Sequence, residues 1–222
     1  MIDFHHHHFE VGEEEGLSIR SFHQQEQQEF ASWTAPCSVG LHPWYLSEQD
    51  KVQDQQLNWL VEAAKAEHVK FIGECGLDKL RGPDLSTQLR VFEQCLQLAE
   101  QYHKPVVIHC VRAFPELLAI YQRVQPTVPW IVHGFNRKPS VLASLLQQGF
   151  YVSFGAAILK PDSPAAQSLV ETPLEQLFLE TDDKLLPIAD LYTHAAQLKG
   201  ILLEDLEAAL YLNWKRITEE KQ

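Results

Sequence analysis

The sequence predicts an α/β fold in which eight short strands alternate with helices, as in a (β/α)8 barrel of the TIM type. Short apolar runs are separated by longer segments in which apolar side chains recur at helical spacing. The length of 222 residues fits one barrel-sized domain over residues 1–222. An apolar content of 45% and a charged content of 22% are those of a folded domain with a sizeable core.

The strands and helices can be placed along the chain. The apolar runs predict strands at 1–5, 17–22, 37–42, 69–74, 105–109, 130–133, 150–154 and 177–180. Helical periodicity predicts helices at 50–66, 87–102, 114–124, 139–148, 164–170, 188–199 and 204–217. Segment 9–16 is too short and too acidic for a barrel helix, so we expect a turn between the first two strands.

A doubly wound open sheet is the alternative fold. Sheets of that kind often carry a glycine-rich phosphate-binding loop after the first strand. The first strand here is followed by neither GxGxxG nor a P-loop. The barrel is therefore favoured, in a distorted form because the first two strands lack a full helix between them.

Charge and cysteine content limit the class of protein. The formal net charge of −12 argues against a protein that coats nucleic acid with a broad basic surface, but not against an enzyme that reaches phosphates through bound metal. No run of 18 apolar residues and no signal segment is found, so we expect no membrane association. The four cysteines have no CxxC spacing, which is typical of reduced thiols in a cytoplasmic protein. We expect a monomer without a protein partner.

A run of four histidines, His5 to His8, stands near the start of the chain. Such a run can be a purification tag or the first part of a metal site. Because side chains alternate along a strand, His5 and His7 point to the same side and can bind one ion.

Further metal-binding side chains fall at the ends of other predicted strands. They are Glu74, His109, His133 and Asp182. The carboxyl ends of barrel strands form the face on which active sites lie. Imidazole and carboxylate together suit zinc, iron or manganese. An unpaired buried polar group costs roughly 1–3 kcal/mol, so a core would not collect six of them without a cation. A tag would have no such partners, so this pattern favours a metal site.

Several motifs now point to a known family. IGECGLD at 72–78 matches IGExGLD, and LETD at 179–182 matches in the expected order. DFHHH at 3–7 fits DxHxH, GLHP at 40–43 fits G-[IL]-H-P, and PVVIH at 105–109, VHGF at 132–135 and YVSFG at 151–155 are similar to further family segments. Over residues 2–215 the sequence resembles the TatD-like metal-dependent hydrolases of the amidohydrolase superfamily.

The resemblance implies a distorted TIM barrel that binds one or two divalent ions (Mg²⁺, Mn²⁺ or Zn²⁺). It implies that His5, His7, Glu74 and Asp182 hold one ion, and that Glu74 bridges to a second ion held by His109 and His133. A bound divalent ion lowers the pKa of water towards ~7 and stabilises charge on the reacting oxygens. The implied catalytic residues are Asp182, which accepts the proton of the attacking water, and Glu74.

Two further residues are candidate substrate contacts. His42 is expected to contact a phosphate, or else to make a structural hydrogen bond near Pro43. Arg112 is expected to neutralise an anionic substrate, or else to pair with a nearby acid.

Three residues near the predicted ligands depart from the family pattern: Trp44, Val111 and Asp183. The favoured function is a deoxyribonuclease that cleaves phosphodiester bonds in DNA. The alternatives are an esterase or deacylase that acts on a carbonyl substrate such as aminoacyl-tRNA, and a barrel that binds metal or a partner without turnover.

Overall fold

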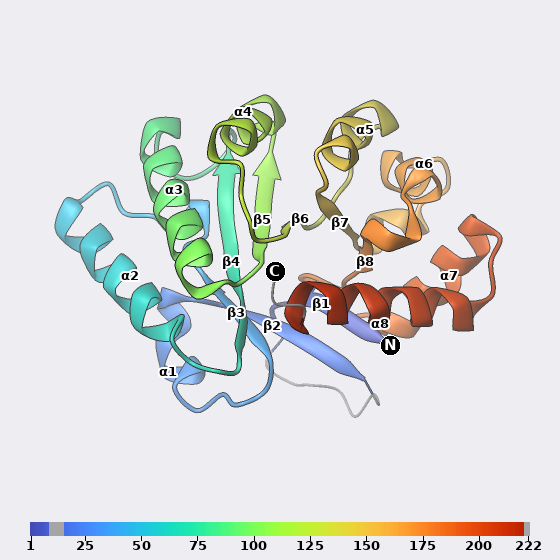
Figure 1. Ribbon diagram of the computed structural model, residues 1–222, viewed down its shortest axis with the longest axis horizontal. Coiled ribbons are helices and arrows are strands. Elements are labelled where there is room, and N and C mark those ends of the chain that lie inside the picture. Colours follow the sequence, from blue (N-terminus) through green and yellow to red (C-terminus); the bar gives the residue numbers. More distant parts are fainter. Residues whose placement is uncertain (9–15, 220–222) are drawn as a thin grey trace. The chain divides into compact units, whose positions relative to one another are not determined.

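A computed structural model of the protein describes residues 1–8 and 16–219 (Figure 1). The turn expected at 9–16 falls almost wholly outside these residues. Strand order along the sheet follows the sequence from β1 to β8. The strands are β1 (Ile2–His6), β2 (Leu17–His23), β3 (Cys37–Gly40), β4 (Val69–Asp78), β5 (Val106–Val111), β6 (Trp130–Val132), β7 (Tyr151–Phe154) and β8 (Leu177–Leu179). The pairs β1–β2, β3–β4, β4–β5, β6–β7 and β7–β8 are all parallel.

The chain forms two compact units. Met1–Arg20 and Ile131–Gln222 make up one, called here the terminal unit, and Ser21–Trp130 make up the other, called the central unit. Each has its own apolar core. The expectation of one domain over the whole chain stays a prediction.

The central unit surrounds β3, β4 and β5 with helices (Figure 1). They are η1 (Gln24–Glu26), α1 (Gln27–Phe30), η2 (Pro43–Tyr45), α2 (Asp50–Ala63), α3 (Leu85–Tyr102) and α4 (Phe114–Val124). Asp84 caps α3 by accepting the Thr87 N–H at 3.0 Å, and His103 ends it in the left-handed region with φ 52°. Phe71, Phe92 and other fully buried side chains fill the core, which removes large apolar surfaces from water.

The terminal unit places α5 to α8 around β1 and β6 to β8. Its helices are α5 (Pro139–Gln147), η3 (Ala156–Leu159), α6 (Pro164–Glu171), η4 (Leu174–Gln176), α7 (Ile188–Lys199) and α8 (Leu203–Glu219). Phe4 of β1 stacks on Phe178 of β8 with ring centroids 4.3 Å apart. The buried hydroxyl of Tyr192 accepts the Ile2 N–H at 3.0 Å and donates to the Ile2 carbonyl at 3.1 Å. These contacts fix β1, the strand that carries His5.

Glycines allow close backbone approach around Glu74. A Cβ at Gly40 would lie 2.4 Å from the Glu74 carbonyl oxygen. Gly73 has φ +146°, and a Cβ there would lie 2.3 Å from the Val107 carbonyl oxygen. A side chain fits at neither position, so these glycines let β3 and β5 pack against the part of β4 that carries Glu74.

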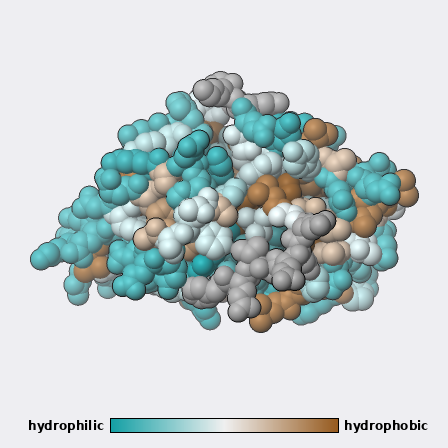
Figure 2. Space-filling model, turned by 90° about the horizontal axis from the view of Figure 1, so that it is seen from below, coloured by the Kyte–Doolittle hydropathy of each residue, from teal (hydrophilic) through white to brown (hydrophobic). Residues whose placement is uncertain are grey.

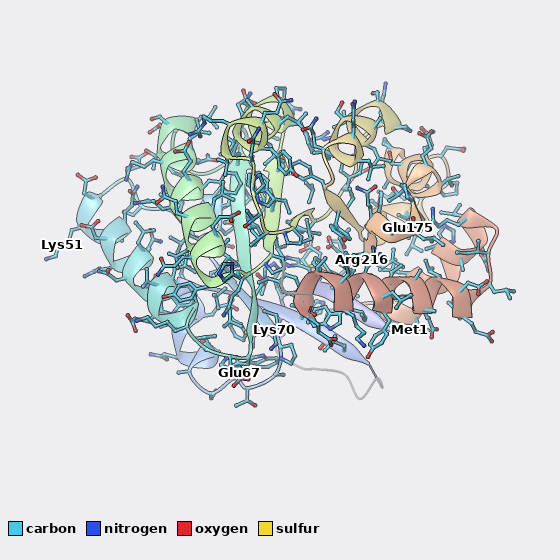
Figure 3. The ribbon with its side chains drawn as sticks, in the orientation of Figure 1. Met1, Lys51, Glu67, Lys70, Glu175 and Arg216 are labelled. Atoms are coloured by element: carbon cyan, nitrogen blue, oxygen red, sulfur yellow. The ribbon has the colours of Figure 1, made fainter. Side chains whose placement is uncertain are left out.

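One face of the molecule is mostly polar. Hydrophilic residues predominate on the face shown in Figure 2, and apolar residues occur there in separate patches. Figure 3 labels several exposed charged residues, among them Lys51 on α2, Arg216 on α8, and Glu67, which lies just before β4. Among the described residues, no helix combines the length and the hydropathy needed to cross a membrane.

Candidate metal centre

Backbone pairing brings the first histidines beside the segment that follows β8. The Asp182 N–H donates to the His5 carbonyl at 2.9 Å, and the His7 N–H donates to the Asp182 carbonyl at 3.2 Å. Asp182 itself has φ 54°, which is uncommon for a residue with a side chain. The pairing therefore fixes His5, His7 and Asp182 as neighbours on the main chain.

The side chains of the terminal unit form a cluster that could hold an ion. The candidate ligand atoms of His5, His133 and Asp182 all lie within 4.8 Å of one another. The His7 Nε2 lies 3.8 Å from Asp182 Oδ1, and the rings of His5 and His7 are 4.9 Å apart. His5 is fully buried, so the N-terminal histidines are part of the folded unit. We call these four side chains the terminal-unit cluster.

A buried carboxylate stands behind His133. Glu180 Oε1 lies 3.4 Å from His133 Nδ1 and accepts the Gly134 N–H at 2.5 Å. Burial acts to raise the pKa of Glu180, but His133 and the nearby His5 together hold it below its ordinary value. An ionised Glu180 fixes the His133 ring from its Nδ1 side, as carboxylates behind metal-binding histidines do.

Asp3 fixes the backbone next to Asp182. Its carboxyl group accepts the Thr181 N–H at 3.0 Å and the Thr181 hydroxyl at 2.6 Å. Burial raises the pKa of Asp3 to about 7, although the bonds from Thr181 act in the opposite direction. Asp3 thus ties β1 to the residue that precedes Asp182.

The central unit holds a second group of potential ligands. Glu74 Oε1 lies 2.8 Å from His109 Nδ1 and 3.0 Å from His42 Nε2, and all three side chains are buried. Their candidate ligand atoms lie within 4.8 Å of one another. We call these three side chains the central-unit cluster. The sequence left His42 open between a contact with substrate and a structural hydrogen bond near Pro43.

The hydrogen bonds of His42 define its role in this cluster. Its Nδ1 accepts the Trp44 N–H at 3.1 Å, so the proton of the neutral ring lies on Nε2. That Nε2–H then donates to Glu74. His42 therefore orients Glu74, which agrees with the structural hydrogen bond near Pro43 that the sequence left open. Its contact with substrate stays a prediction.

His109 lies between two carboxylates. Its Nε2 is 3.1 Å from Asp78 Oδ2, on the side of the ring opposite Glu74. Burial acts to raise the pKa of Asp78, but the bonds from Trp44 and His109 hold it below its ordinary value. An Nε2–H donated to Asp78 leaves Nδ1 as the electron-pair donor, which is the arrangement found behind metal-bound histidines.

The donor chemistry of both clusters fits a divalent transition metal. Imidazoles and carboxylates, most of them buried and several oriented by further carboxylates, suit Zn²⁺ or Mn²⁺. Arg112 is exposed after β5 and, within residues 1–8 and 16–219, belongs to neither cluster. Its contact with substrate and the bridging role of Glu74 stay predictions.

Comparison with known proteins identifies the family. The sequence model of the TatD-related DNases matches residues 16–219. The chain belongs to this family. The matched residues begin after β1 and do not include His5 and His7. The placement of these two histidines therefore depends on the hydrogen bonds and distances described above. The family predicted from the motifs is confirmed.

Three members of the TatD family illustrate the similarity. A protein named as an uncharacterized metal-dependent hydrolase, YjjV of Escherichia coli, is 29% identical over 153 residues, covering 68% of this chain and 59% of YjjV. The putative deoxyribonuclease TATDN1 homolog of Enterocytozoon bieneusi is 26% identical over 187 residues, covering 80% of this chain and 66% of that protein. The human 3′-5′ RNA nuclease TATDN2 is 36% identical over 152 residues, covering 65% of this chain and 19% of TATDN2.

A solved TatD structure gives the fold. The crystal structure of YjjV superposes with a TM-score of 0.85 at 24% identity, covering 99% of this chain and 98% of that one. The predicted fold class, a TIM barrel with alternating strands and helices, is confirmed by this likeness.

Proposed function

We propose that the protein is a divalent-metal-dependent hydrolase that cleaves phosphodiester bonds, with DNA as its substrate. The observation that carries the proposal is the convergence of His5, His7, His133 and Asp182 in the terminal-unit cluster. Both nuclease relatives named above act on nucleic acid by their names, which supports a phosphodiester substrate. We propose one ion at the terminal-unit cluster and one at Glu74 and His109 of the central-unit cluster, with Zn²⁺, Mn²⁺ and Mg²⁺ as candidates.

Asp182 is the proposed proton acceptor. Its side chain is 36% exposed, whereas that of Glu74 is 3% exposed, so water reaches Asp182 more easily. A bound ion would supply an activated water and stabilise negative charge on the phosphate. The Asp182 carboxylate would take the proton that this water loses.

The other side chains keep the ligands in place. Glu180 orients His133, and Asp78 orients His109. His42 holds Glu74 by donating from Nε2. Because these partners are buried, little rearrangement is needed when an ion binds. We propose that the protein acts as a cytoplasmic monomer, in keeping with the absence of CxxC spacing among its four cysteines.

Hydrolysis of single-stranded DNA tests the proposal. Activity should disappear with a chelator and return when Mg²⁺, Mn²⁺ or Zn²⁺ is added. Asp182→Asn should lower kcat by at least about 100-fold, because general-base catalysis contributes roughly 10²–10⁴-fold. Asp183→Asn is the matched control, since Asp183 is exposed and pairs with Lys184. No turnover of any phosphodiester by the metal-loaded protein would exclude a nuclease.

A carboxylic ester is the second candidate substrate. Asp183 and Lys184 follow the shared LETD sequence, and Val111 follows Cys110 in β5, so two segments beside the clusters differ from the family pattern. Aminoacyl-tRNA and small esters should therefore be assayed beside DNA on one preparation. Turnover of the ester alone would replace DNA by a carbonyl substrate. Partner binding that Asp182→Asn leaves unchanged, with no turnover of either substrate by the wild-type protein, would indicate a non-catalytic role.

A further inference from the structure

Two aromatic side chains lie exposed beside the central-unit cluster. Trp44 is 38% exposed and Tyr45 46% exposed, and both belong to η2, directly after His42. The Trp44 ring lies 4.9 Å from the His42 ring and 5.6 Å from the His109 ring, in both cases edge to face. A large aromatic surface therefore faces solvent within contact distance of the candidate ligands.

Trp44 is held in a fixed position. Its Nε1–H donates to Asp78 Oδ2 at 2.6 Å, and this same oxygen lies 3.1 Å from His109 Nε2. Asp78 Oδ1 accepts the backbone N–H groups of Leu80 at 2.7 Å and Arg81 at 3.2 Å. The polar atom of the indole is thus satisfied while part of the ring stays exposed, as in aromatic side chains that serve as stacking platforms.

A cation lies over the same ring. The Arg81 guanidinium carbon is 4.4 Å from the centre of the Trp44 ring, and Arg81 is exposed. Its backbone is fixed through Asp78, and Gln88 of α3 fixes this turn further by donating to the Arg81 and Pro83 carbonyls. In a chain with net charge −12, a positioned guanidinium beside metal-binding side chains favours an anionic ligand.

We propose that Trp44 and Arg81 form a nucleotide-recognition site for single-stranded nucleic acid. The Trp44 indole stacks on an unpaired base, and the Arg81 guanidinium pairs with the adjoining phosphate. Duplex bases are already stacked on each other, so the site selects single strands or frayed ends. Asp78 is a positioning residue, because one oxygen contacts both Trp44 and His109.

The proposal rests on phosphodiester cleavage as the function. Strands of abasic sites, which have the phosphates but no bases, separate the test of this site from the test of that function. Trp44→Leu should raise KM for a single-stranded oligonucleotide about tenfold, because the stacking of one base on the indole is lost. The same variant should leave KM for a strand of abasic sites unchanged, and Trp44→Phe should give an intermediate value. Arg81→Gln should raise KM for both strands and weaken its dependence on salt.

Two control variants and one binding measurement complete the test. Tyr211→Leu removes an exposed aromatic ring from α8, and Arg123→Gln removes an exposed guanidinium from α4; both should match the wild type. Fluorescence anisotropy of labelled normal and abasic strands gives the same comparison without turnover. Base-dependent binding that Trp44→Leu abolishes would support the site even if no strand is cleaved. Equal effects of Trp44→Leu on normal and abasic strands, or no effect on either, would overturn it.

Discussion

Glu180 and Asp78 are the site residues that sequence reasoning missed. Glu180 lies in the LETD motif and contacts the His133 ring, and Asp78 lies in the IGECGLD motif and contacts the His109 ring. The motifs were a signal that both positions matter, but no spacing rule pairs Glu180 with His133, which is far away in the sequence. A carboxylate partner of this kind is specified by tertiary packing.

The role of Glu180 can be tested through metal affinity. Glu180→Gln keeps the size of the side chain but removes the negative charge that fixes His133. Loss of such a partner typically weakens metal binding 10–100-fold. Competition with a chromophoric chelator should show this decrease in affinity for the ion at the terminal-unit cluster.

Glu171→Gln is the control for Glu180→Gln. Glu171 is an exposed acid at the end of α6, and its substitution should leave metal affinity unchanged. If Glu180→Gln also binds metal as tightly as the wild type, the orienting role is wrong.

The predicted ligands illustrate what the sequence can reveal about a site. Strand alternation predicted that His5 and His7 lie on one side. Their ring centroids are 4.9 Å apart, although β1 ends at His6, and their role as ligands stays a prediction. The hydrogen bonding of His42 could not be predicted, because it depends on a turn in which the Trp44 N–H points back at Nδ1. The sequence could therefore predict which side chains face one another along a strand, but not the hydrogen-bond partners that depend on a turn.

At the scale of elements, strong periodicity gave accurate bounds. The helices predicted at 114–124 and 188–199 coincide with α4 and α7. β4, in contrast, continues past its predicted end at Glu74 to Asp78. Gly73 and Gly76 argue locally against a strand, but pairing with β5 (Gly76 with His109, Asp78 with Val111) outweighs this preference. The extension carries Asp78 to His109.

The first turn of α3 should make stability depend on pH. Bonds from the Ser86 hydroxyl and the Thr87 N–H hold the pKa of Asp84 at about 2, below its ordinary value of 3.8. A lowered acid pKa contributes stability above about pH 4 that is lost as the pH falls towards about 2. Asp84→Ala should therefore lower the urea midpoint at neutral pH, and this deficit should shrink in acid.

Asp84→Asn is the matched variant for this cap. Its side-chain oxygen still accepts the Thr87 N–H, but it has no proton to gain. The difference in midpoint between the wild type and Asp84→Asn should decrease between pH 5 and pH 2.5. A difference that stays constant over this range would show that Asp84 does not contribute in its ionised form.

At the scale of the whole molecule, each compact unit contributes a cluster of its own. The terminal-unit cluster joins β1 and the segments after β6 and β8, and the central-unit cluster joins the segment after β3 with β4 and β5. Alternating strands and helices predicted one site in which Glu74 bridges two ions, because the ends of parallel strands gather the residues that follow them. That joint site stays a prediction. A division into two units leaves no mark in the sequence, because Arg20 and Trp130 lie within ordinary strands.

Metal binding should therefore stabilise the folded chain. An ion that binds only the native state at 100 times its Kd adds about 2.7 kcal/mol to the free energy of unfolding. For a chain of this size, that corresponds to a rise in Tm on the order of 5–10 °C. Differential scanning calorimetry of chelated and Mn²⁺- or Zn²⁺-loaded protein should show this rise. His5→Gln should reduce it by removing a buried ligand of the terminal-unit cluster, whereas His103→Asn changes an exposed histidine at the end of α3 and should leave it unchanged. Equal melting temperatures with and without metal, in a protein that is folded in both samples, would mean that neither cluster binds an ion in the native state.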